Sequence, residues 1–318
     1  MSNILLEARH LVKEFPAGGK KKVHAVSDIS LKIYEGETLG LVGESGCGKS
    51  TLGRTLIRLI TPDKGEVFFK GNQISGLSDR EFRPYRRQMQ LIFQDPYASL
   101  DPRMTVRNLI AEPLKTYKVC PSKEDLNRKV LELMQAAGIP GEFLYRYSHQ
   151  FSGGQRQRIG IARALAIDPA LIVCDEPVSA LDVSVQNQIL NLLKELQKTR
   201  GLTYLFISHD LSVVRHLSDR VAIMFLGKLC ETGRTEEVYR APMHPYTRFL
   251  LNSVPVPDPR KRNDQAELLQ GEIPSPVDPP SGCRFHTRCP YATEKCRQEE
   301  PQMRQFGGRE VACHFPLA

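Results

Sequence analysis

The sequence has no long hydrophobic run and no leader-like N-terminus. No stretch reaches the roughly 18 unbroken apolar residues by which a membrane-spanning helix is recognised. Residues 1–10 lack the basic start and the apolar core of a secretory signal. These absences predict a chain that stays in the cytosol and reaches a membrane only through a partner.

The sequence also lacks an internal repeat, which predicts a single module rather than a tandem pair. Of its 318 residues, 41% are hydrophobic and 25% are charged, as in an ordinary globular protein. This length allows one large core with a smaller appendage, or two modest domains.

The net charge does not distinguish a nucleic-acid partner from a position at a membrane. A net charge of +8 fits nucleic-acid binding, but it also fits a position under an anionic membrane leaflet. The densest basic run consists of Arg80, Arg83, Arg86 and Arg87. Its simplest interpretation is a solvated helical face.

Strand-like and helix-like segments alternate along most of the chain. Segments of strand length occur at 4–11, 26–33, 37–42, 65–69, 89–93, 171–174 and 202–207. Helical patterns occur at 49–59, from 95 to about 150, at 156–167 and at 185–199. The alternation predicts an α/β sheet with helical covers, interrupted by a helical insertion.

The texture of the sequence changes after about His244. The segment Val254–Pro257 alternates valine with proline, and further prolines follow at 274, 276, 279 and 280. Proline donates no backbone hydrogen bond, so this stretch fits neither a core helix nor a central strand. We place a domain boundary near residue 250, with a small C-terminal extension beyond it.

Residues Gly43–Ser50 (GESGCGKS), the phosphate loop, fit the pattern G-x-x-x-x-G-K-[ST] at every fixed position. Glycines are needed because backbone N–H groups close around a phosphate and leave no room for side chains. Lys49 would reach the β- and γ-phosphates, and the Ser50 hydroxyl would bind Mg²⁺. The apolar strand before and the helix after argue against a chance glycine-rich turn. The predicted nucleotide-binding residues of this region are Gly43, Glu44, Ser45, Gly46, Cys47, Gly48, Lys49, Ser50 and Thr51.

Two carboxylates follow the apolar strand at 171–174. Asp175 and Glu176 would emerge at the C-terminal end of that strand, where α/β sheets build their sites. Asp175 would hold Mg²⁺ directly or through water, and Glu176 would polarise the attacking water as general base. Adjacent acids are often plain surface residues, but the apolar strand that leads into them favours the functional interpretation.

A second loop of small residues, Ser152–Gln155, opens the helix expected at 156–167. A serine hydroxyl, backbone N–H groups and a helix N-terminus together form an anion site. With Phe151 before it, this segment (FSGGQ) resembles the signature loop of the ABC ATPase family, in which leucine is commoner than phenylalanine at the first position.

The other elements of that family are present in the expected order. Gln94 resembles the Q-loop residue, Ser179–Asp182 resembles the D-loop, and His209 resembles the switch histidine. Each is weak alone, since a lone glutamine or a strand-end histidine is usually structural. Together with the phosphate loop they span residues 43–209, and the resemblance covers about the first 250 residues.

The resemblance implies a shared nucleotide site. In this family two ATPase subunits meet head to tail, and ATP lies between the phosphate loop of one and the signature loop of the other. The residues Ser152, Gly153, Gly154 and Gln155 would therefore serve the nucleotide of the partner, and the D-loop residue Asp182 would add to the nucleotide contacts. Phe15 stands where an aromatic residue of the family stacks on adenine.

The resemblance also implies the catalytic roles. Gln94 would contact Mg²⁺ and the attacking water, and His209 would contact the γ-phosphate and steady the transition state with Glu176. The expected catalytic set is Glu176, His209, Gln94 and Lys49, and the expected Mg²⁺ ligands are Ser50, Gln94 and Asp175.

Segments outside the common motifs resemble the dipeptide/oligopeptide importer branch of the family. They are DPYASLDPR at 95–103, HPYT at 244–247 and the tail at 282–313. EPVSALDVS at 176–184 resembles the second of the two ATPase subunits of those importers. The implied protein couples ATP hydrolysis to peptide uptake at the cytoplasmic face of the inner membrane. The implied partners are a sister ATPase subunit, two transmembrane permease subunits and an extracellular or periplasmic substrate-binding protein, without nucleic acid.

The implied fold is α/β, of the P-loop NTPase class. It has a RecA-like core sheet, an antiparallel ABC β-subdomain, a helical insertion and a small Cys-rich C-terminal extension. We expect the ABC nucleotide-binding domain at 1–248, with its helical subdomain at about 95–158. Residues 249–318 would form a proline-rich linker and the C-terminal oligopeptide-transporter-type domain.

Four of the eight cysteines crowd into the end of the chain: Cys283, Cys289, Cys296 and Cys313. In a reducing cytosol such a cluster indicates a metal site rather than disulfides. Four thiolates suit either tetrahedral Zn²⁺ or a [4Fe–4S] cluster, and the wide spacings fit zinc ribbons poorly. Relatives in the importer branch carry an iron–sulfur cluster, so we favour the cluster over Zn²⁺ and both over thiols without metal.

Other functions stay open at this point. A soluble ABC ATPase that acts on ribosomes or nucleic acid usually has two cassettes or a coiled-coil insertion, and this sequence has neither. An export ATPase is commonly fused to membrane helices. The cargo stays open because the ATPase subunit never touches it, and the same branch includes importers of nickel and glutathione.

Overall fold

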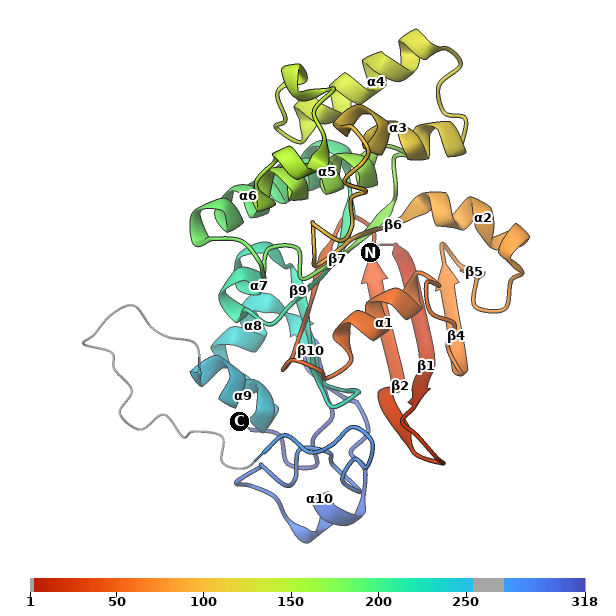
Figure 1. Cartoon of the computed structure of the whole chain (residues 1–318). Helices are drawn as coiled ribbons and strands as arrows, with labels where there is room; N and C mark the ends of the chain where they lie inside the picture. Colours follow the sequence, from red (N-terminus) through yellow and green to blue (C-terminus); the bar gives the residue numbers. More distant parts are fainter. Residues whose placement is uncertain (1–2, 254–271, 318) are drawn as a thin grey trace, which may run out of the picture. The chain divides into compact units, whose positions relative to one another are not determined.

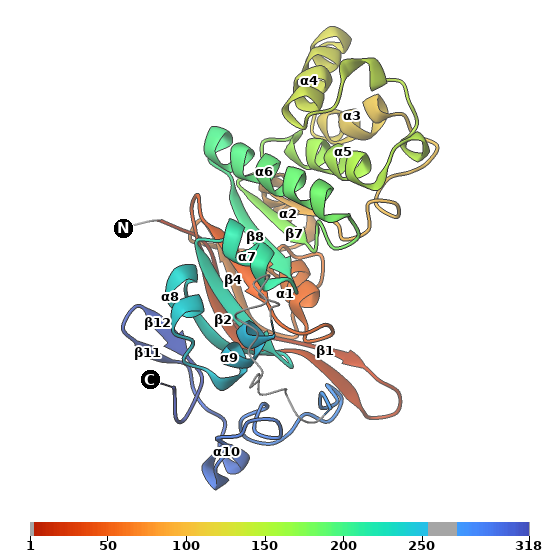
Figure 2. The ribbon, with the colours of Figure 1, turned by 90° about the vertical axis from the view of Figure 1, so that its left-hand side faces the viewer.

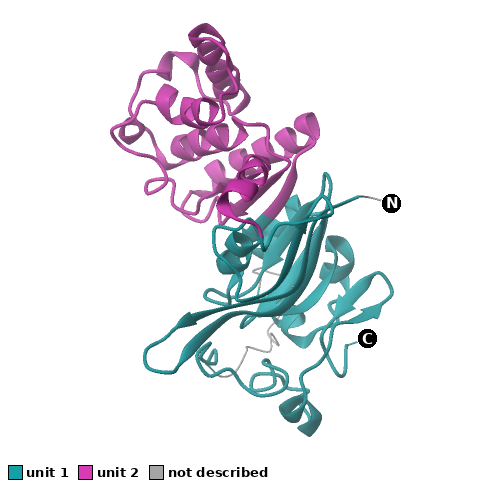
Figure 3. Ribbon diagram, turned by 90° about the vertical axis from the view of Figure 1, so that its right-hand side faces the viewer, with its two compact units in different colours: residues 1–76, 206–318 teal, residues 77–205 magenta. Residues whose placement is uncertain are grey.

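The computed structural model describes residues 3–253 and 272–317. The chain forms two compact units (Figure 3): unit 1 comprises residues 1–76 and 206–318, and unit 2 comprises residues 77–205. Unit 1 therefore combines both ends of the chain, whereas unit 2 is a continuous middle segment. Within the described segments, no helix has the length and apolar character needed to cross a membrane.

Unit 1 contains an antiparallel sheet built on a long hairpin. β1 (Ile4–Pro16) pairs with β2 (Lys22–Tyr34), and the sheet continues in the order β2-β1-β4-β5 with β4 (Lys64–Phe69) and β5 (Asn72–Gln73) (Figure 1). From Asp28 to Ile33, exposed and buried residues alternate along β2, so one face of the strand packs into the core. Both hairpin strands are longer than the sequence segments that predicted them.

A second sheet in unit 1 leads into the phosphate loop. β3 (Thr38–Val42) is buried at every residue and runs parallel to β9 (Arg220–Phe225). A strand covered on both faces needs a continuous apolar run, which accounts for the pattern at 37–42. Antiparallel pairing then adds three further strands, β10 (Lys228–Arg234), β12 (Arg309–Val311) and β11 (Arg304–Phe306).

The strands β11 and β12 belong to the C-terminal extension, and they form a short hairpin (Figure 2). β12 pairs with β10 through Glu231 opposite Val311 and Thr232 opposite Glu310. The described part of the extension therefore continues the sheet of unit 1. The helices of unit 1 are α1 (Lys49–Leu56), α7 (Leu211–Leu217), α8 (Thr235–Arg240), α9 (Pro245–Asn252) and α10 (Glu294–Gln298).

Unit 2 joins parallel strands to a group of helices. β6 (Met89–Ile92) runs parallel to β7 (Leu171–Asp175), and β8 (Thr203–Ser208) has residues in both units. The helices, seen in Figure 1, are α2 (Asp79–Gln88), α3 (Val106–Thr116), α4 (Lys123–Ala136), α5 (Gly153–Leu165) and α6 (Val183–Arg200), with short 3-10 turns at Gly141–Phe143 and Ser148–Gln150.

Side chains fix where several of these helices begin. Ser78, Thr105 and Ser122 each accept the backbone N–H three residues later and so cap α2, α3 and α4. Gly201 ends α6 in the left-handed conformation, with φ 63°. Loss of one such N-cap typically costs about 1 kcal/mol.

The structure confirms the predicted α/β class and the alternation of strands and helices. It also confirms the arginine-rich run as an exposed face of α2. The prolines at 274, 276, 279 and 280 lie in irregular chain, while Pro255 and Pro257 of the predicted linker fall outside the described residues. The domain limits 1–248, 95–158 and 249–318 stay predictions.

Candidate active site

The phosphate loop connects β3 to α1, and two of its glycines are required by close contacts. A Cβ atom on Gly43 would lie 2.0 Å from the carbonyl oxygen of Met224. A Cβ atom on Gly48 would lie 2.0 Å from the carbonyl oxygen of Ala25, and Gly48 also has φ +103°. The N-cap residue of α1 is Gly48, which has no side chain to cap the helix. This suits a helix end that receives an anionic ligand.

Lys49 lies inside the loop rather than in solvent. Its side chain is buried, and its ammonium group donates hydrogen bonds to the carbonyl oxygens of Gly43 (2.8 Å) and Glu44 (2.9 Å). Cys47 is also buried, and burial raises the pKa of its thiol. The loop thus holds one cation and a neutral small side chain at its centre.

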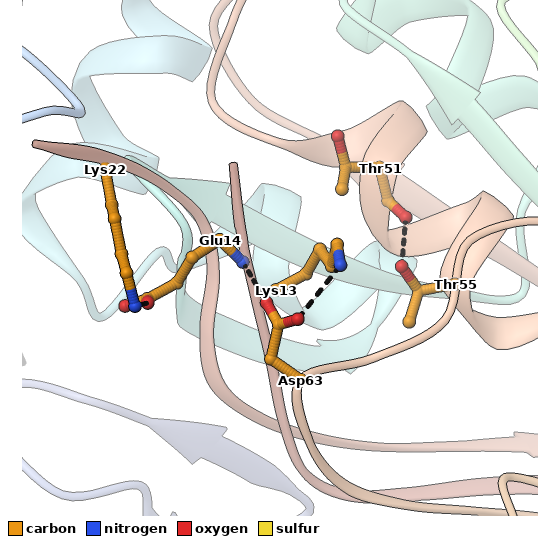
Figure 4. A network of polar contacts seen from close by, with 6 residues as sticks. All are labelled: Lys13, Glu14, Lys22, Thr51, Thr55 and Asp63. Atoms are coloured by element: carbon orange, nitrogen blue, oxygen red, sulfur yellow. Dashed lines mark hydrogen bonds and ion pairs between the residues drawn. The ribbon is translucent and has the colours of Figure 1, made fainter. Parts of the chain in front are cut away.

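The rest of the loop leads into the first turn of α1. Ser45 and Gly46 are exposed, whereas Ser50 and Thr51 are half-buried. The carbonyl oxygen of Thr51 accepts a hydrogen bond of 2.7 Å from the Thr55 hydroxyl (Figure 4). This bond lies within α1 and uses the backbone of Thr51, not its hydroxyl.

A polar network fixes the end of β1 that carries Phe15 (Figure 4). Asp63 accepts hydrogen bonds from the Lys13 ammonium (3.0 Å) and from the Glu14 backbone N–H (2.7 Å). Glu14 accepts one from the Lys22 ammonium across the hairpin (2.7 Å), and this bond lowers the pKa of Glu14. Phe15 is half-buried on the strand that these contacts hold.

In unit 2 the structure brings Gln94 and Glu176 together. The Gln94 amide donates a hydrogen bond of 3.0 Å from Nε2 to Oε2 of Glu176, across 82 positions of sequence. β6 and β7 are parallel with Ile92 opposite Cys174, so Gln94 and Glu176 each follow a paired residue by the same offset. The parallel register therefore accounts for the contact.

Glu176 has a strained backbone. Its φ is +47°, a region that residues other than glycine, asparagine and aspartate rarely adopt. Such strain costs about 1–3 kcal/mol and clusters at functional sites. Asp175, which precedes it at the end of β7, is fully buried. Both predicted carboxylates are thus held in defined positions at one strand end.

The signature loop forms the N-terminus of α5. The Ser152 hydroxyl accepts the Gln155 N–H (3.4 Å), and Oε1 of Gln155 accepts the Ser152 N–H (3.1 Å), which makes a capping box. A Cβ atom on Gly154 would lie 2.3 Å from Cγ1 of Val185 in α6, so this position needs a residue without a side chain. Ser152 and Gln155 are exposed.

Phe151 is buried and its ring meets that of Phe143 edge to face, with centroids 5.6 Å apart. The large apolar residue before the signature loop is therefore part of the packing of unit 2. The ring anchors the chain at the point where α5 begins.

Asp182 and His209 both stand at helix beginnings. Asp182 caps α6, and hydrogen bonds from the Ser184 hydroxyl (2.7 Å) and the Val185 N–H (2.9 Å) lower the pKa of its carboxyl. His209 follows β8 and is exposed, directly before Asp210, the cap of α7.

The predicted site residues are divided between the two units. The phosphate loop, Phe15 and His209 belong to unit 1, whereas Gln94, Asp175, Glu176, Asp182 and the signature loop belong to unit 2. Within unit 2 the structure unites Gln94 with Glu176. The roles of all these residues, and the Mg²⁺ set Ser50, Gln94 and Asp175, stay predictions.

Two residues that contact the phosphate loop lie outside the catalytic motifs. The Tyr246 hydroxyl accepts the Glu44 N–H (3.0 Å), and the Arg288 guanidinium pairs with the Glu44 carboxylate (2.9 Å). Tyr246 belongs to the HPYT segment at 244–247, which the sequence analysis had singled out, although without predicting this contact. Arg288 stands in a cysteine-rich tail, and only the tertiary structure reveals its contact.

The four C-terminal cysteines line one cavity, together with His286, His314 and apolar residues. Burial raises the pKa of Cys283 to about 12 and that of Cys289 to about 11, so as free thiols they would stay protonated. Among residues 3–253 and 272–317, no group of three or more His, Cys, Asp or Glu that could hold a metal ion is present. The four cysteines expected to bind metal therefore line one cavity, but the described residues do not form a preorganised set of metal ligands.

Comparison with known families gives two matches. A family described as "ABC transporter" matches residues 26–179. A family described as "Oligopeptide/dipeptide transporter, C-terminal region" matches residues 230–296. The second match covers β10, α9 and part of the cysteine-rich tail.

Whole-chain relatives and a solved structure agree with these matches. The oligopeptide transport ATP-binding protein AppF of Bacillus subtilis (strain 168) is 52% identical, over 98% of this chain and 97% of AppF. OppF of Salmonella typhimurium (strain LT2), an oligopeptide transport ATP-binding protein, is 52% identical over 92% of this chain and 88% of OppF. A dimeric, post-hydrolysis structure of the ATP-binding cassette MJ0796 with ADP and Pi matches with TM-score 0.67 and 31% identity, over 72% of this chain and 98% of that chain. The chain therefore belongs to the ABC transporter family, as an ATP-hydrolysing subunit of the branch that carries the oligopeptide/dipeptide transporter C-terminal region.

Proposed function

We propose that this chain drives an importer of oligopeptides and dipeptides from the cytoplasmic face of the membrane. Its partners would be two transmembrane permease subunits, a sister ATPase subunit and an extracellular or periplasmic substrate-binding protein. The observation that carries the proposal is the presence, in one chain, of the phosphate loop and of a C-terminal segment that matches the oligopeptide/dipeptide transporter C-terminal region.

ATP hydrolysis would use Glu176, Gln94, His209 and Lys49. Glu176 would take a proton from the attacking water, whose oxygen forms a bond to the γ-phosphorus while the bond to the β–γ bridging oxygen breaks. Gln94, already bonded to Glu176, would orient that water. His209 would contact the γ-phosphate, and Lys49 would reach the β- and γ-phosphates.

Magnesium would be held by Ser50, Gln94 and Asp175, which supply the hydroxyl, amide and carboxylate oxygens that this ion prefers. When bound, Mg²⁺ supplies charge neutralisation on the phosphate oxygens. Asp175 is the one anionic member of the set, and its complete burial keeps the carboxylate at the end of β7.

A second subunit would complete the nucleotide-binding site. Ser152, Gly153, Gly154 and Gln155 would contact the ATP of the sister subunit, with Asp182 close to the same interface, while Phe15 would stack on this chain's adenine. The exposure of Ser152 and Gln155 supports this assignment, as does the likeness to a dimeric cassette. In the proposed organisation, residues 1–248 form the ABC domain, with a helical subdomain at about 95–158, and residues 249–318 form the linker and C-terminal domain.

The cysteine cavity would hold a [4Fe–4S] cluster, with Zn²⁺ as the alternative. The donor set supports this, because Cys283, Cys289, Cys296 and Cys313 line the same cavity. A bound metal would also offset the burial that raises the pKa of the Cys283 and Cys289 thiols. Iron, sulfide and zinc analysis of the purified chain, with Cys289→Ser as comparison, separates the two. Equal metal content in both proteins would contradict the assignment.

Affinity purification from the native cell and an uptake assay together test the function. We expect two integral membrane proteins and a second ATP-binding subunit to copurify with the tagged chain. Deletion of the gene for this chain should abolish uptake of labelled di- and oligopeptides. Expression of the wild-type chain should restore uptake, and expression of Glu176→Gln should not. Copurification of ribosomes or RNA without membrane proteins would contradict the proposal, and lost uptake of nickel or glutathione with normal peptide uptake would reject peptide as cargo.

A further inference from the structure

The C-terminal extension contacts the phosphate loop directly. Nη1 of Arg288 donates to both carboxylate oxygens of Glu44, at 3.1 and 2.9 Å, across 244 positions of sequence. The Arg288 side chain is only 6% exposed, so the pair is largely withdrawn from water. Opposite charges attract more strongly in such a place than at the surface, and loss of Arg288 leaves the half-buried Glu44 carboxylate without this partner.

A second contact reaches the same residue of the loop through α9. The Tyr246 hydroxyl accepts the backbone N–H of Glu44 (3.0 Å). The Tyr246 ring is fully buried, and its centroid lies 5.3 Å from that of Phe285, which belongs to the extension. Both the backbone and the side chain of Glu44 are therefore held from outside the loop.

The position of Tyr246 is itself fixed by a buried carboxylate. Glu231 on β10 is fully buried and accepts the N–H groups of Met243 (3.1 Å) and His244 (2.9 Å), just before the first turn of α9. The backbone N–H of Tyr246 donates to Nδ1 of His244 (3.1 Å). These bonds therefore hold the Tyr246 hydroxyl in a fixed position as a hydrogen-bond acceptor.

A third contact reaches the other half of the loop. Arg284 in the extension donates hydrogen bonds to the Leu226 carbonyl oxygen and to the Ser27 hydroxyl. The next residue, Gly227, donates its N–H to the Cys47 carbonyl oxygen (2.9 Å). The segment 283–289 therefore supports the phosphate loop on two sides.

Charge gives these contacts a consequence for nucleotide binding. Glu44 places a carboxylate in a loop that must receive a polyphosphate anion, and an unpaired carboxylate there would repel it. Arg288 cancels that charge and holds the carboxylate toward the extension. Tyr246 holds the backbone of the same residue.

We propose that Arg288 and Tyr246 are positioning residues of the phosphate loop, through which the C-terminal extension sets the affinity of the chain for ATP. The inference rests on the proposed function, because it takes the loop as the ATP site. It adds that the extension is part of the nucleotide machinery and not only an appendage.

A charge-removal pair tests the proposal in the purified full-length chain, with MgATP as the probe. Arg288→Met leaves Glu44 unpaired, and we expect the Kd for MgATP to rise about fivefold or more. Glu44→Gln alters a residue of the loop itself, so its Kd for MgATP is the reference against which the double variant is compared. The double variant Arg288→Met/Glu44→Gln removes both charges and should recover most of the lost affinity, with kcat of the assembled transporter nearly constant and KM for ATP following the Kd.

A third variant and a control complete the test. Tyr246→Phe removes one oxygen, keeps the ring against Phe285 and should raise the Kd for MgATP about two- to fivefold. Glu300→Gln breaks the ion pair of Glu300 with Lys228, which also joins the extension to β10 but does not touch the phosphate loop. This control should bind MgATP like the wild type.

The outcomes separate the inference from the proposed function. Folded Arg288→Met and Tyr246→Phe with wild-type affinity for MgATP would overturn the inference, as would an equal loss in Glu300→Gln. Where Arg288→Met does not fold, Tyr246→Phe alone decides. Wild-type protein that fails to bind MgATP would instead remove the proposed function itself.

Discussion

The two loops expected to contact nucleotide are held in different ways. The phosphate loop is stabilised by residues distant in sequence, Tyr246 and Arg288, and by a lysine buried within it. The signature loop is stabilised locally, by the capping box of Ser152 with Gln155, and these two residues are exposed. Distant parts of unit 1 complete the phosphate loop, whereas the signature loop is a helix N-terminus that exposes Ser152 and Gln155. This difference matches the proposed roles, in which the phosphate loop binds the nucleotide of its own chain and the signature loop contacts the nucleotide of the sister subunit.

The largest effect should come from Glu176, the proposed general base. In Glu176→Gln the side chain cannot take the proton of the attacking water, so ATP hydrolysis by the assembled transporter should fall about 10²- to 10⁴-fold. Phosphate release measures this, and binding of MgATP should persist. Glu142→Gln, an exposed glutamate of the same unit, should hydrolyse ATP normally. Near-normal turnover in Glu176→Gln would contradict the general-base role.

Lys49→Ala should impair nucleotide binding by the phosphate loop and leave the signature loop unchanged. The ammonium is buried among loop carbonyls, and loss of its charge-assisted contacts should weaken MgATP binding by the isolated chain about 10- to 100-fold. Equilibrium binding of a fluorescent ATP analogue measures the change. Ser152→Ala in the same assay serves as the matched loop variant and should bind normally. Equal losses in both would remove the distinction between the loops.

The pH dependence of stability should report on the helix that supports the phosphate loop. His244 caps α9 as a neutral acceptor, and burial lowers its pKa to about 4. The unfolded chain, with an ordinary histidine pKa near 6.5, takes up the proton first, so stability falls as the pH drops from about 6.5 toward 4.

At about pH 5 this histidine should cost about 2 kcal/mol relative to neutral pH, as measured by urea denaturation. His244→Asn keeps a capping oxygen but does not titrate, so it should lose this part of the pH dependence. The same pH dependence in both proteins would show that another group is responsible.

Ser152→Ala should give the smallest change, because the signature loop depends on a local cap. We expect a loss of about 1 kcal/mol in the stability of unit 2 from the missing cap of α5. Hydrogen exchange at the N-terminus of α5 measures the local part of it. Faster exchange at the phosphate loop of the same variant would contradict the local character of the cap.

Much of the fold was accessible from sequence because its patterns are local. The buried run at 38–42 and the helix at 183–200 follow from apolar periodicity and clear end signals. The strands β11 and β12 were not predicted, since each has three residues and exists through pairing with a neighbour. The predicted four-cysteine site is intermediate: its residues share a cavity, but the described residues contain no metal-holding group.

The sequence alone determined the phosphate loop, the acidic strand end and the signature loop, because each depends on backbone geometry that consecutive residues specify. Only the tertiary structure decided that Gln94 meets Glu176 and that Arg288 and Tyr246 hold Glu44. Those contacts join residues 82 to 244 positions apart. They depend on strand register and on the docking of the extension, and no local pattern encodes either.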